Sequence, residues 1–144
     1  MQYWLLKTEP ETYSFSDLVR EGTTVWDGVR NHQAKANLDR MGKGDQVLIY
    51  HTGKERSAVG RGFISRAAYP DPTDPTDTWL AVDVTATGPL ACPVALKTLR
   101  QRDDFVGSTL LTNPRLSVVP LPSSLWEELL RLGQTCSHET SEIE

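Results

Sequence analysis

The chain has 144 residues, 38% of them hydrophobic, and a formal net charge of −4 at pH 7. This length predicts a single domain with its own hydrophobic core, which we place at residues 1–133, followed by a polar tail at 134–144 that is expected to be disordered. No apolar run is long enough to cross a membrane, and the N-terminal residues MQYWLLKTEPE lack the basic region of a secretion signal, so a soluble, cytoplasmic protein is expected.

The first part of the chain predicts two strands, each followed by a helix. Tyr3–Thr8 is rich in aromatic and aliphatic residues, as a strand is. A short helix is expected at Ser16–Glu21, closed by a glycine. Val25–Trp26 predicts a short strand, and Asn31 is a preferred N-cap for a helix at 32–41.

The middle of the chain predicts an antiparallel meander of three strands. Residues 47–52 are mostly apolar on both faces, which is typical of a central strand buried on two sides. Residues 58–69 predict a long strand, and the glycines within it favour a bend. Residues 70–77, with the sequence PDPTDPTD, predict a loop, and 79–85 resume the alternation of a strand.

The C-terminal third predicts two further helices around a last strand. Residues 93–102 favour a short helix, and 116–119 favour a strand that ends before two prolines. Ser124 and Glu127 have the spacing of a capping box, which predicts that a terminal helix begins there. Five or six strands with short helices between them predict an α+β fold, a small mixed β-barrel with flanking helices.

Recognisable catalytic chemistry is missing from the sequence. His32, His51 and His138 stand in no recognisable relation to a serine or cysteine nucleophile. The spacing of Cys92 and Cys136 predicts neither a disulfide framework nor a zinc site. We therefore expect a protein that is not an enzyme and that has no metal or cofactor. A monomer is also expected.

The segment Trp26–Asn31 suits the binding of a planar ligand better than the building of a core. It combines a flat aromatic ring, an Asp-Gly turn, a cation and an amide within a few residues. Because Asn31 is also expected to cap the next helix, Trp26, Arg30 and Asn31 are predicted to converge where a strand turns into a helix.

Basic residues are concentrated in the middle of the chain. Lys and Arg outnumber Asp and Glu by five over residues 28–66, whereas acidic residues are in excess on both sides. One interpretation is a solvated face without function. The other is contact with nucleic acid, because neutralised phosphates supply most non-specific affinity. The candidates for phosphate contacts are Lys35, Arg40, Lys43, Lys54, Arg56 and Arg61.

Five motifs resemble the EVE domain, and together they cover residues 1 to about 132. They lie at Tyr3–Pro10, Trp26–Ala34, Gly44–Thr52, Tyr69–Thr73 and Arg115–Val118. The resemblance implies a PUA-like fold and the reading of a modified base, with modified cytosine in DNA as the first expectation. The alternative is an RNA-binding module that recognises a modified or unpaired nucleotide. A third interpretation, an enzyme acting on a small heterocycle, lacks a candidate nucleophile.

The resemblance also implies a base-binding pocket. Trp26 and Tyr50 would form its aromatic walls, and Asn31, with the backbone of Val29 and Arg30, would read the edge of the base. The other pocket residues, most of them around the mouth, are Lys7, His51, Thr52, Arg115, Leu116 and Ser117. Simpler roles stay open: a helix cap for Asn31, a satisfied core position for His51, surface charges for Arg30 and Arg115, and the core for Trp4.

Overall fold

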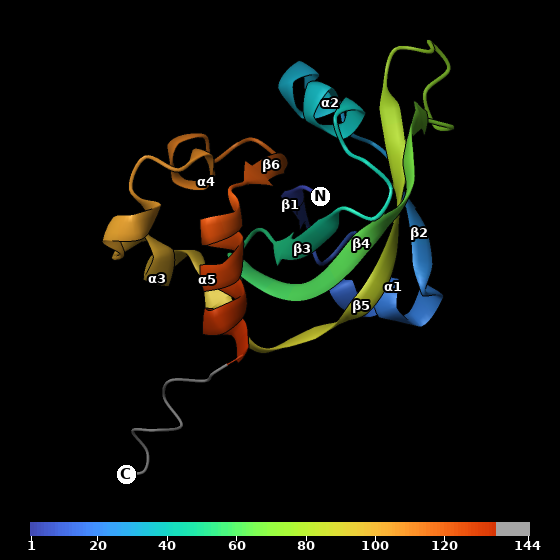
Figure 1. Ribbon diagram of the computed structural model, residues 1–144. Coiled ribbons are helices and arrows are strands. Elements are labelled where there is room, and N and C mark those ends of the chain that lie inside the picture. Colours follow the sequence, from blue (N-terminus) through green and yellow to red (C-terminus); the bar gives the residue numbers. More distant parts are fainter. Residues whose placement is uncertain (135–144) are drawn as a thin grey trace.

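Six strands and five α-helices follow one another along residues 1–134, which are the residues that the computed structural model describes (Figure 1). The strands are β1 (Tyr3–Thr8), β2 (Thr23–Trp26), β3 (Gln46–His51), β4 (Ser57–Pro70), β5 (Leu80–Ala95) and β6 (Val118–Leu121). The helices are α1 (Phe15–Glu21), α2 (His32–Asp39), α3 (Leu96–Arg100), α4 (Thr109–Thr112) and α5 (Ser123–Gln134), with a 3₁₀ turn at Asp103–Phe105. Of the predicted tail only Gln134 is described, as the last residue of α5, and the rest lies outside the described residues.

One six-stranded sheet forms the body of the domain, in the order β2-β5-β4-β3-β1-β6. β1 and β3 run parallel, and the other neighbours run antiparallel. Register shifts along β4 bend the sheet, which curls but leaves β2 and β6 as two open edges (Figure 1). The expected α+β fold with short flanking helices is confirmed, and its sheet is barrel-like without being closed.

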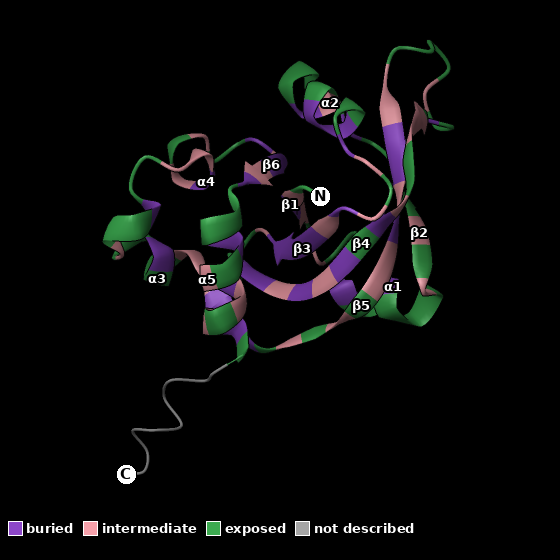
Figure 2. Cartoon of the chain, in the orientation of Figure 1, coloured by how far each residue is buried: buried purple, intermediate pink, exposed green. Residues whose placement is uncertain are grey.

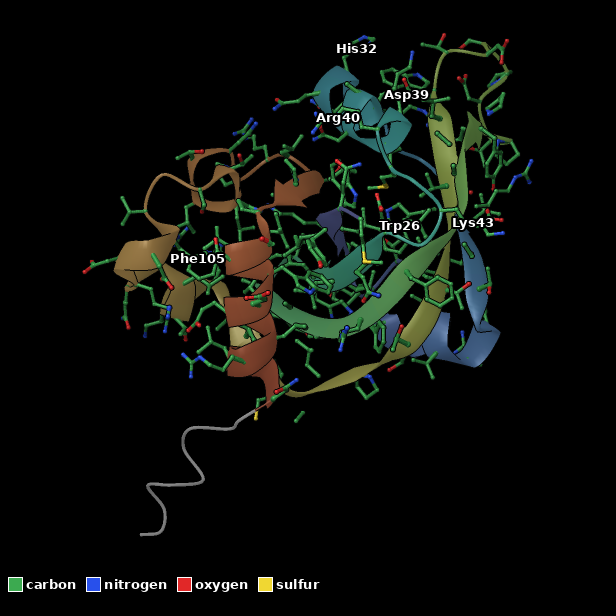
Figure 3. All side chains as sticks on the ribbon, viewed as in Figure 1. Trp26, His32, Asp39, Arg40, Lys43 and Phe105 are labelled. Atoms are coloured by element: carbon green, nitrogen blue, oxygen red, sulfur yellow. The ribbon has the colours of Figure 1, made fainter. Side chains whose placement is uncertain are left out.

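Helix α2 begins at the last residue of the Trp26–Asn31 segment. Asn31 is its N-cap, because the Asn31 Oδ1 accepts a hydrogen bond from Ala34 N–H at 2.9 Å. The helix ends at Asp39, slightly earlier than expected. Figure 3 shows this helix above Trp26. The strand-to-helix junction predicted from the sequence is therefore present.

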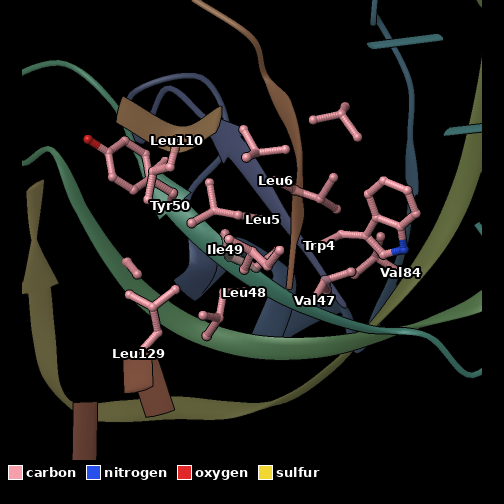
Figure 4. Packing of buried hydrophobic residues seen from close by; sticks show 14 of the residues in the cluster. Trp4, Leu5, Leu6, Val47, Leu48, Ile49, Tyr50, Val84, Leu110 and Leu129 are labelled. Carbon is pink, nitrogen blue, oxygen red and sulfur yellow. The ribbon is translucent and has the colours of Figure 1, made fainter. Parts of the chain in front are cut away.

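The hydrophobic core lies on both sides of the paired strands β1 and β3. Trp4–Leu6 pairs with Val47–Ile49, and none of these residues is more than 1% exposed. Because consecutive residues of a strand point to opposite faces, both strands are covered on two sides (Figures 2 and 4). The indole N–H of Trp4 donates to Asp45 Oδ2 at 3.1 Å. The sequence was right to expect a central strand at 47–52 and a core role for Trp4.

Strand β5 is much longer than the sequence predicted, and it takes the first three residues of the helix expected at 93–102. It continues through Pro89 and Pro93, and only Leu96–Arg100 is helical. Its ladder with β2 ends at Thr85, and beyond that residue β5 pairs with β4 alone. A strand edge without a partner tolerates proline, because no ladder hydrogen bond is lost there.

The last strand and the last helix are also displaced from their predicted positions. β6 begins at Val118 rather than Leu116, and it includes Pro120, which an edge strand tolerates. Helix α5 begins at Ser123, so Ser124 lies inside it and the predicted capping box is wrong. No helix within residues 1–134 is both long and apolar enough to cross a membrane.

Cys92 is buried on β5. Cys136, the other cysteine of the chain, lies outside the described residues, so the expectation drawn from cysteine spacing stays a prediction.

Candidate functional site

Two neighbouring cavities lie at the C-terminal ends of β1, β2 and β3, and Lys7 lines both of them. The larger, here called the Trp26 cavity, has a volume of about 510 Å³ and is lined by Lys7, Thr8, Thr12, Tyr13, Glu21, Thr24, Val25, Trp26, Asp27, Gly28, Val29, Arg30 and Ser117. The smaller, here called the Tyr50 cavity, has a volume of about 280 Å³ and is lined by Lys7, Tyr50, Thr52, Gly53, Arg56, Leu96, Arg100, Leu110, Leu111 and Pro114.

Trp26, the last residue of β2, forms an aromatic wall of the Trp26 cavity. It is 8% exposed, and its ring meets the ring of Tyr13 edge-on, with the two centroids 6.3 Å apart. Val29 is equally buried and lines the same cavity. An aromatic ring beside a buried aliphatic side chain suits the stacking of a flat, partly apolar ligand.

Asp71, in the loop between β4 and β5, anchors the turn that follows Trp26. Its Oδ2 accepts hydrogen bonds from Gly28 N–H at 2.8 Å and from Arg30 Nη1 at 2.9 Å. Burial alone raises the pKa of Asp71, but hydrogen bonds from the Thr73 hydroxyl, Arg30 and Gly28 outweigh it and lower the pKa to about 2. The Arg30 charge is therefore largely engaged by Asp71, a partner that sequence reasoning assigned to a plain loop.

Two carboxylates, Glu21 and Asp27, line the Trp26 cavity together with two cations. The Tyr13 hydroxyl donates to Glu21 Oε1 at 2.6 Å, and burial together with this hydrogen bond raises the pKa of Tyr13 to about 12. Desolvation, and secondarily the charge of Asp71, raises the pKa of Asp27. Carboxylates accept hydrogen bonds, so this wall can bind an amino group. Sequence reasoning missed Tyr13 and Asp27, although Asp27 stands inside the motif.

Tyr50 lines the Tyr50 cavity and not the Trp26 cavity. Its neighbour across the strand ladder is Lys7, whose Nζ lies 5.5 Å from the centre of the Tyr50 ring and donates to the Pro114 carbonyl at 2.9 Å. This arrangement corrects the prediction that Trp26 and Tyr50 wall a single pocket. Sequence reasoning also missed Arg100, which lines the Tyr50 cavity and comes from the short helix α3.

His51 has a structural role rather than a place in either cavity. Its Nε2 accepts a hydrogen bond from Phe15 N–H at 3.0 Å, and its Nδ1 lies 2.9 Å from Glu55 Oε1. Because Nε2 is an acceptor, the ring proton sits on Nδ1 and is donated to Glu55. His51 is thus a satisfied core histidine.

The remaining predicted pocket residues are spread over several environments. Ser117 lines the Trp26 cavity and Thr52 lines the Tyr50 cavity. Asn31 and Arg115 are exposed and line neither cavity, and Leu116 belongs to the core. Within the described part of the chain, no group of three or more His, Cys, Asp or Glu side chains is arranged to hold a metal ion.

The cations predicted to contact phosphates are not gathered at one site. Arg56 lines the Tyr50 cavity. Arg61 lies 5.7 Å from the ring of Trp126, and Arg40 lies 5.5 Å from the ring of Trp4. The candidates that line neither cavity are Lys35, Arg40, Lys43, Lys54 and Arg61.

The curled sheet and its two cavities define a small α+β domain with a candidate ligand-binding site. A YTH domain from Zygosaccharomyces rouxii, solved in complex with N6-methyladenosine RNA, superposes with a TM-score of 0.60 over 93% of this chain and 87% of that chain. The two sequences are 14% identical, so this likeness concerns the fold alone.

The EVE domain family matches residues 2–132, and the chain belongs to this family. Mouse thymocyte nuclear protein 1 is 34% identical over 167 residues, which cover 92% of this chain and 74% of the relative. A crystal structure of human thymocyte nuclear protein 1 in complex with DNA containing 5-methylcytosine superposes with a TM-score of 0.85 at 30% identity, over 94% of this chain and 99% of that chain. The family expected from the sequence motifs is confirmed.

Proposed function

We propose that the chain is a non-enzymatic reader of a modified base in nucleic acid, with modified cytosine in DNA as its ligand. The observation that carries this proposal is the Trp26 cavity, in a chain whose human relative has been solved with DNA containing 5-methylcytosine. The cavity volume of about 510 Å³ falls within the range of small-ligand sites, about 300 to 1,000 Å³. It can therefore take a base that has left the helical stack.

The expected preference for methylated over plain cytosine can be estimated from base stacking and methyl burial in the Trp26 cavity. A base stacked on one aromatic ring gains about 1 to 3 kcal/mol, whereas extruding it from a duplex costs a few kcal/mol. A methyl group buried against Val29 and Trp26 adds about 0.8 kcal/mol, or about fourfold in affinity. We therefore expect a modest preference for methylated cytosine and tighter binding to single strands than to duplexes.

Asp27 is the residue that we expect to read the edge of the base. Cytosine presents an exocyclic amino group, which donates hydrogen bonds, and carboxylates accept them. Asp27 lines the Trp26 cavity, where its carboxylate oxygens are accessible to such a donor. Thymine has a carbonyl at the same position and should be rejected.

The side chains that line the Trp26 cavity favour a binding function over catalysis. A hydroxyl nucleophile needs a general base within hydrogen-bond reach, and His51 is occupied by Phe15 and Glu55. The hydroxyls at the Trp26 cavity therefore have no histidine partner among the described residues. Turnover of a nucleoside by the purified protein would contradict this part of the proposal.

Binding of fluorescent oligonucleotides tests the proposal. Matched strands with one cytosine or one 5-methylcytosine are compared as DNA and as RNA, at one stated salt concentration. We expect the methylated DNA to bind best and Trp26→Leu to lose the preference. Trp126→Leu is the matched control, because Trp126 is also buried but lines neither cavity. Equal affinity of the unmodified protein for both cytosines would overturn the reader proposal, and stronger binding of RNA would favour the alternative.

A further inference from the structure

The Tyr50 cavity differs in charge from the Trp26 cavity, and this difference points to a different ligand group. We propose that it binds a phosphate of the nucleic acid strand next to the base that occupies the Trp26 cavity. This inference rests on the proposed function, because it assigns the second cavity to the same ligand.

Three cations line the Tyr50 cavity, and no carboxylate does. Lys7, Arg56 and Arg100 come from β1, from the turn after β3 and from α3, so the fold brings them together from distant parts of the chain. The Trp26 cavity, by contrast, has as many carboxylates as cations. A concentrated positive charge favours an anion, and guanidinium groups match the geometry of phosphate oxygens.

The pKa values of Tyr50 and Lys7 reflect the burial and the positive charge of this cavity. Burial raises the pKa of Tyr50, and the charges of Arg56 and Arg100 act in the opposite direction. Burial also lowers the pKa of Lys7, because its ammonium group loses water without gaining a carboxylate. A bound phosphate would restore the lost stabilisation of that charge.

Lys7 links the two ligand positions. Its side chain lines both cavities, so a base in one and a phosphate in the other belong to neighbouring parts of one strand. The half-buried side chains of Leu96 and Leu111 complete the Tyr50 cavity, and they offer an apolar surface for the sugar. This separation gives the two cavities distinct tasks, because phosphate contacts position a strand whereas base contacts specify it.

The test is the salt dependence of oligonucleotide binding by the double variant Arg56→Gln/Arg100→Gln. Each lost phosphate contact should reduce the slope of log affinity against log salt by about 0.7 to 0.9. Because the cavity holds one phosphate, we expect a reduction of about 0.7 to 0.9, with an unchanged ratio of affinities for 5-methylcytosine and cytosine. Arg56→Lys/Arg100→Lys should restore the slope. Thermal unfolding confirms that each variant is folded.

Arg66→Gln/Arg131→Gln is the matched control, since it removes the same charge from exposed residues that line neither cavity. An equal loss of slope in this control would overturn the proposal, and so would an unchanged slope in the cavity variant. A loss of the base preference would show that the Tyr50 cavity belongs to the base site, and would overturn it too. If the unmodified protein shows no base preference, the proposed function fails independently.

Neutral methylphosphonate linkages distinguish a strand phosphate from a free one. We expect that neutralising one linkage beside the modified base weakens the binding of the oligonucleotide to the unmodified protein. The same neutral linkage should leave the affinity of Arg56→Gln/Arg100→Gln unchanged. Titration with inorganic phosphate forms the second arm. Tight binding of inorganic phosphate with no sensitivity to any methylphosphonate would show a site for a free anion and would overturn the assignment to the strand.

Discussion

Arg30 and Asp71 form an ion pair at 2.9 Å although they are 41 residues apart. The pair joins the turn after Trp26 to the loop between β4 and β5, and the same Asp71 oxygen accepts the Gly28 N–H. The position of one wall of the Trp26 cavity therefore depends on a carboxylate that lies outside its lining. Asp71 acts by positioning the turn rather than by touching a ligand.

Replacing Asp71 by Asn is expected to destabilise the domain at neutral pH. The pKa of Asp71 falls from 3.8 to about 2 in the folded state, which corresponds to about 2 kcal/mol of stability from the ionised carboxylate. Urea denaturation measures this loss. Asp77→Asn is the control, because Asp77 is exposed in the same loop and its replacement should change little.

The stability that the ionised Asp71 contributes should depend on pH. Because the folded pKa of Asp71 lies below the unfolded value of 3.8, the contribution is complete above about pH 4 and is lost as the pH falls towards about 2. The difference in unfolding free energy between the unmodified protein and Asp71→Asn should therefore shrink below about pH 4. A difference that stays constant over this range would count against the ionised Asp71 as its source.

His51→Ala is expected to cost about 1 to 3 kcal/mol, because the buried Phe15 N–H loses its acceptor. Glu55→Gln should cost less, since Glu55 is exposed and exposed ion pairs contribute little. Neither variant should change the ratio of affinities for methylated and plain cytosine. A changed ratio in a folded His51 variant would return this residue to the base contact predicted from the sequence.

Strand and core positions followed from the sequence where local pattern and tertiary environment agree. The apolar runs of β1 and β3 lie in the centre of the sheet, and both were predicted within a residue or two. The second half of β5 was missed because Pro89 and Pro93 are unfavourable in most strands. They are accommodated only because β5 has a single partner there, which no local pattern shows.

In the candidate site, too, the sequence predicted only the features that depend on neighbouring residues. Trp26 and the Asn31 cap depend on neighbouring residues, and turn chemistry identifies them. Trp26 and Tyr50 lie on strands that are not neighbours in the sheet, and the role of Asp71 depends on a partner far away in the chain. Such relationships are set by the register of the sheet rather than by a motif.

Asn31→Ala is expected to cost about 0.5 to 2 kcal/mol, because the Ala34 N–H loses the capping oxygen. Asn31→Ser should retain most of the stability, since serine is also a good cap. Both variants should keep the preference for methylated cytosine, because Asn31 lines neither cavity. If Asn31→Ser remained stable but lost the preference, Asn31 would read the base edge as the family resemblance implied.

Gly60→Ala is expected to destabilise the domain through a clash in the core. A Cβ at this position would lie 2.4 Å from ring carbons of Phe15, and relieving such overpacking costs about 1 to 3 kcal/mol. Phe15→Leu removes the ring, so the double variant should lose less stability than the two single variants added together. Gly88→Ala on β5 is the control, because its added Cβ meets nothing within 4 Å. Urea denaturation of the variants measures the coupling, and strictly additive losses would show that the close approach of Phe15 to β4 does not require a glycine at residue 60.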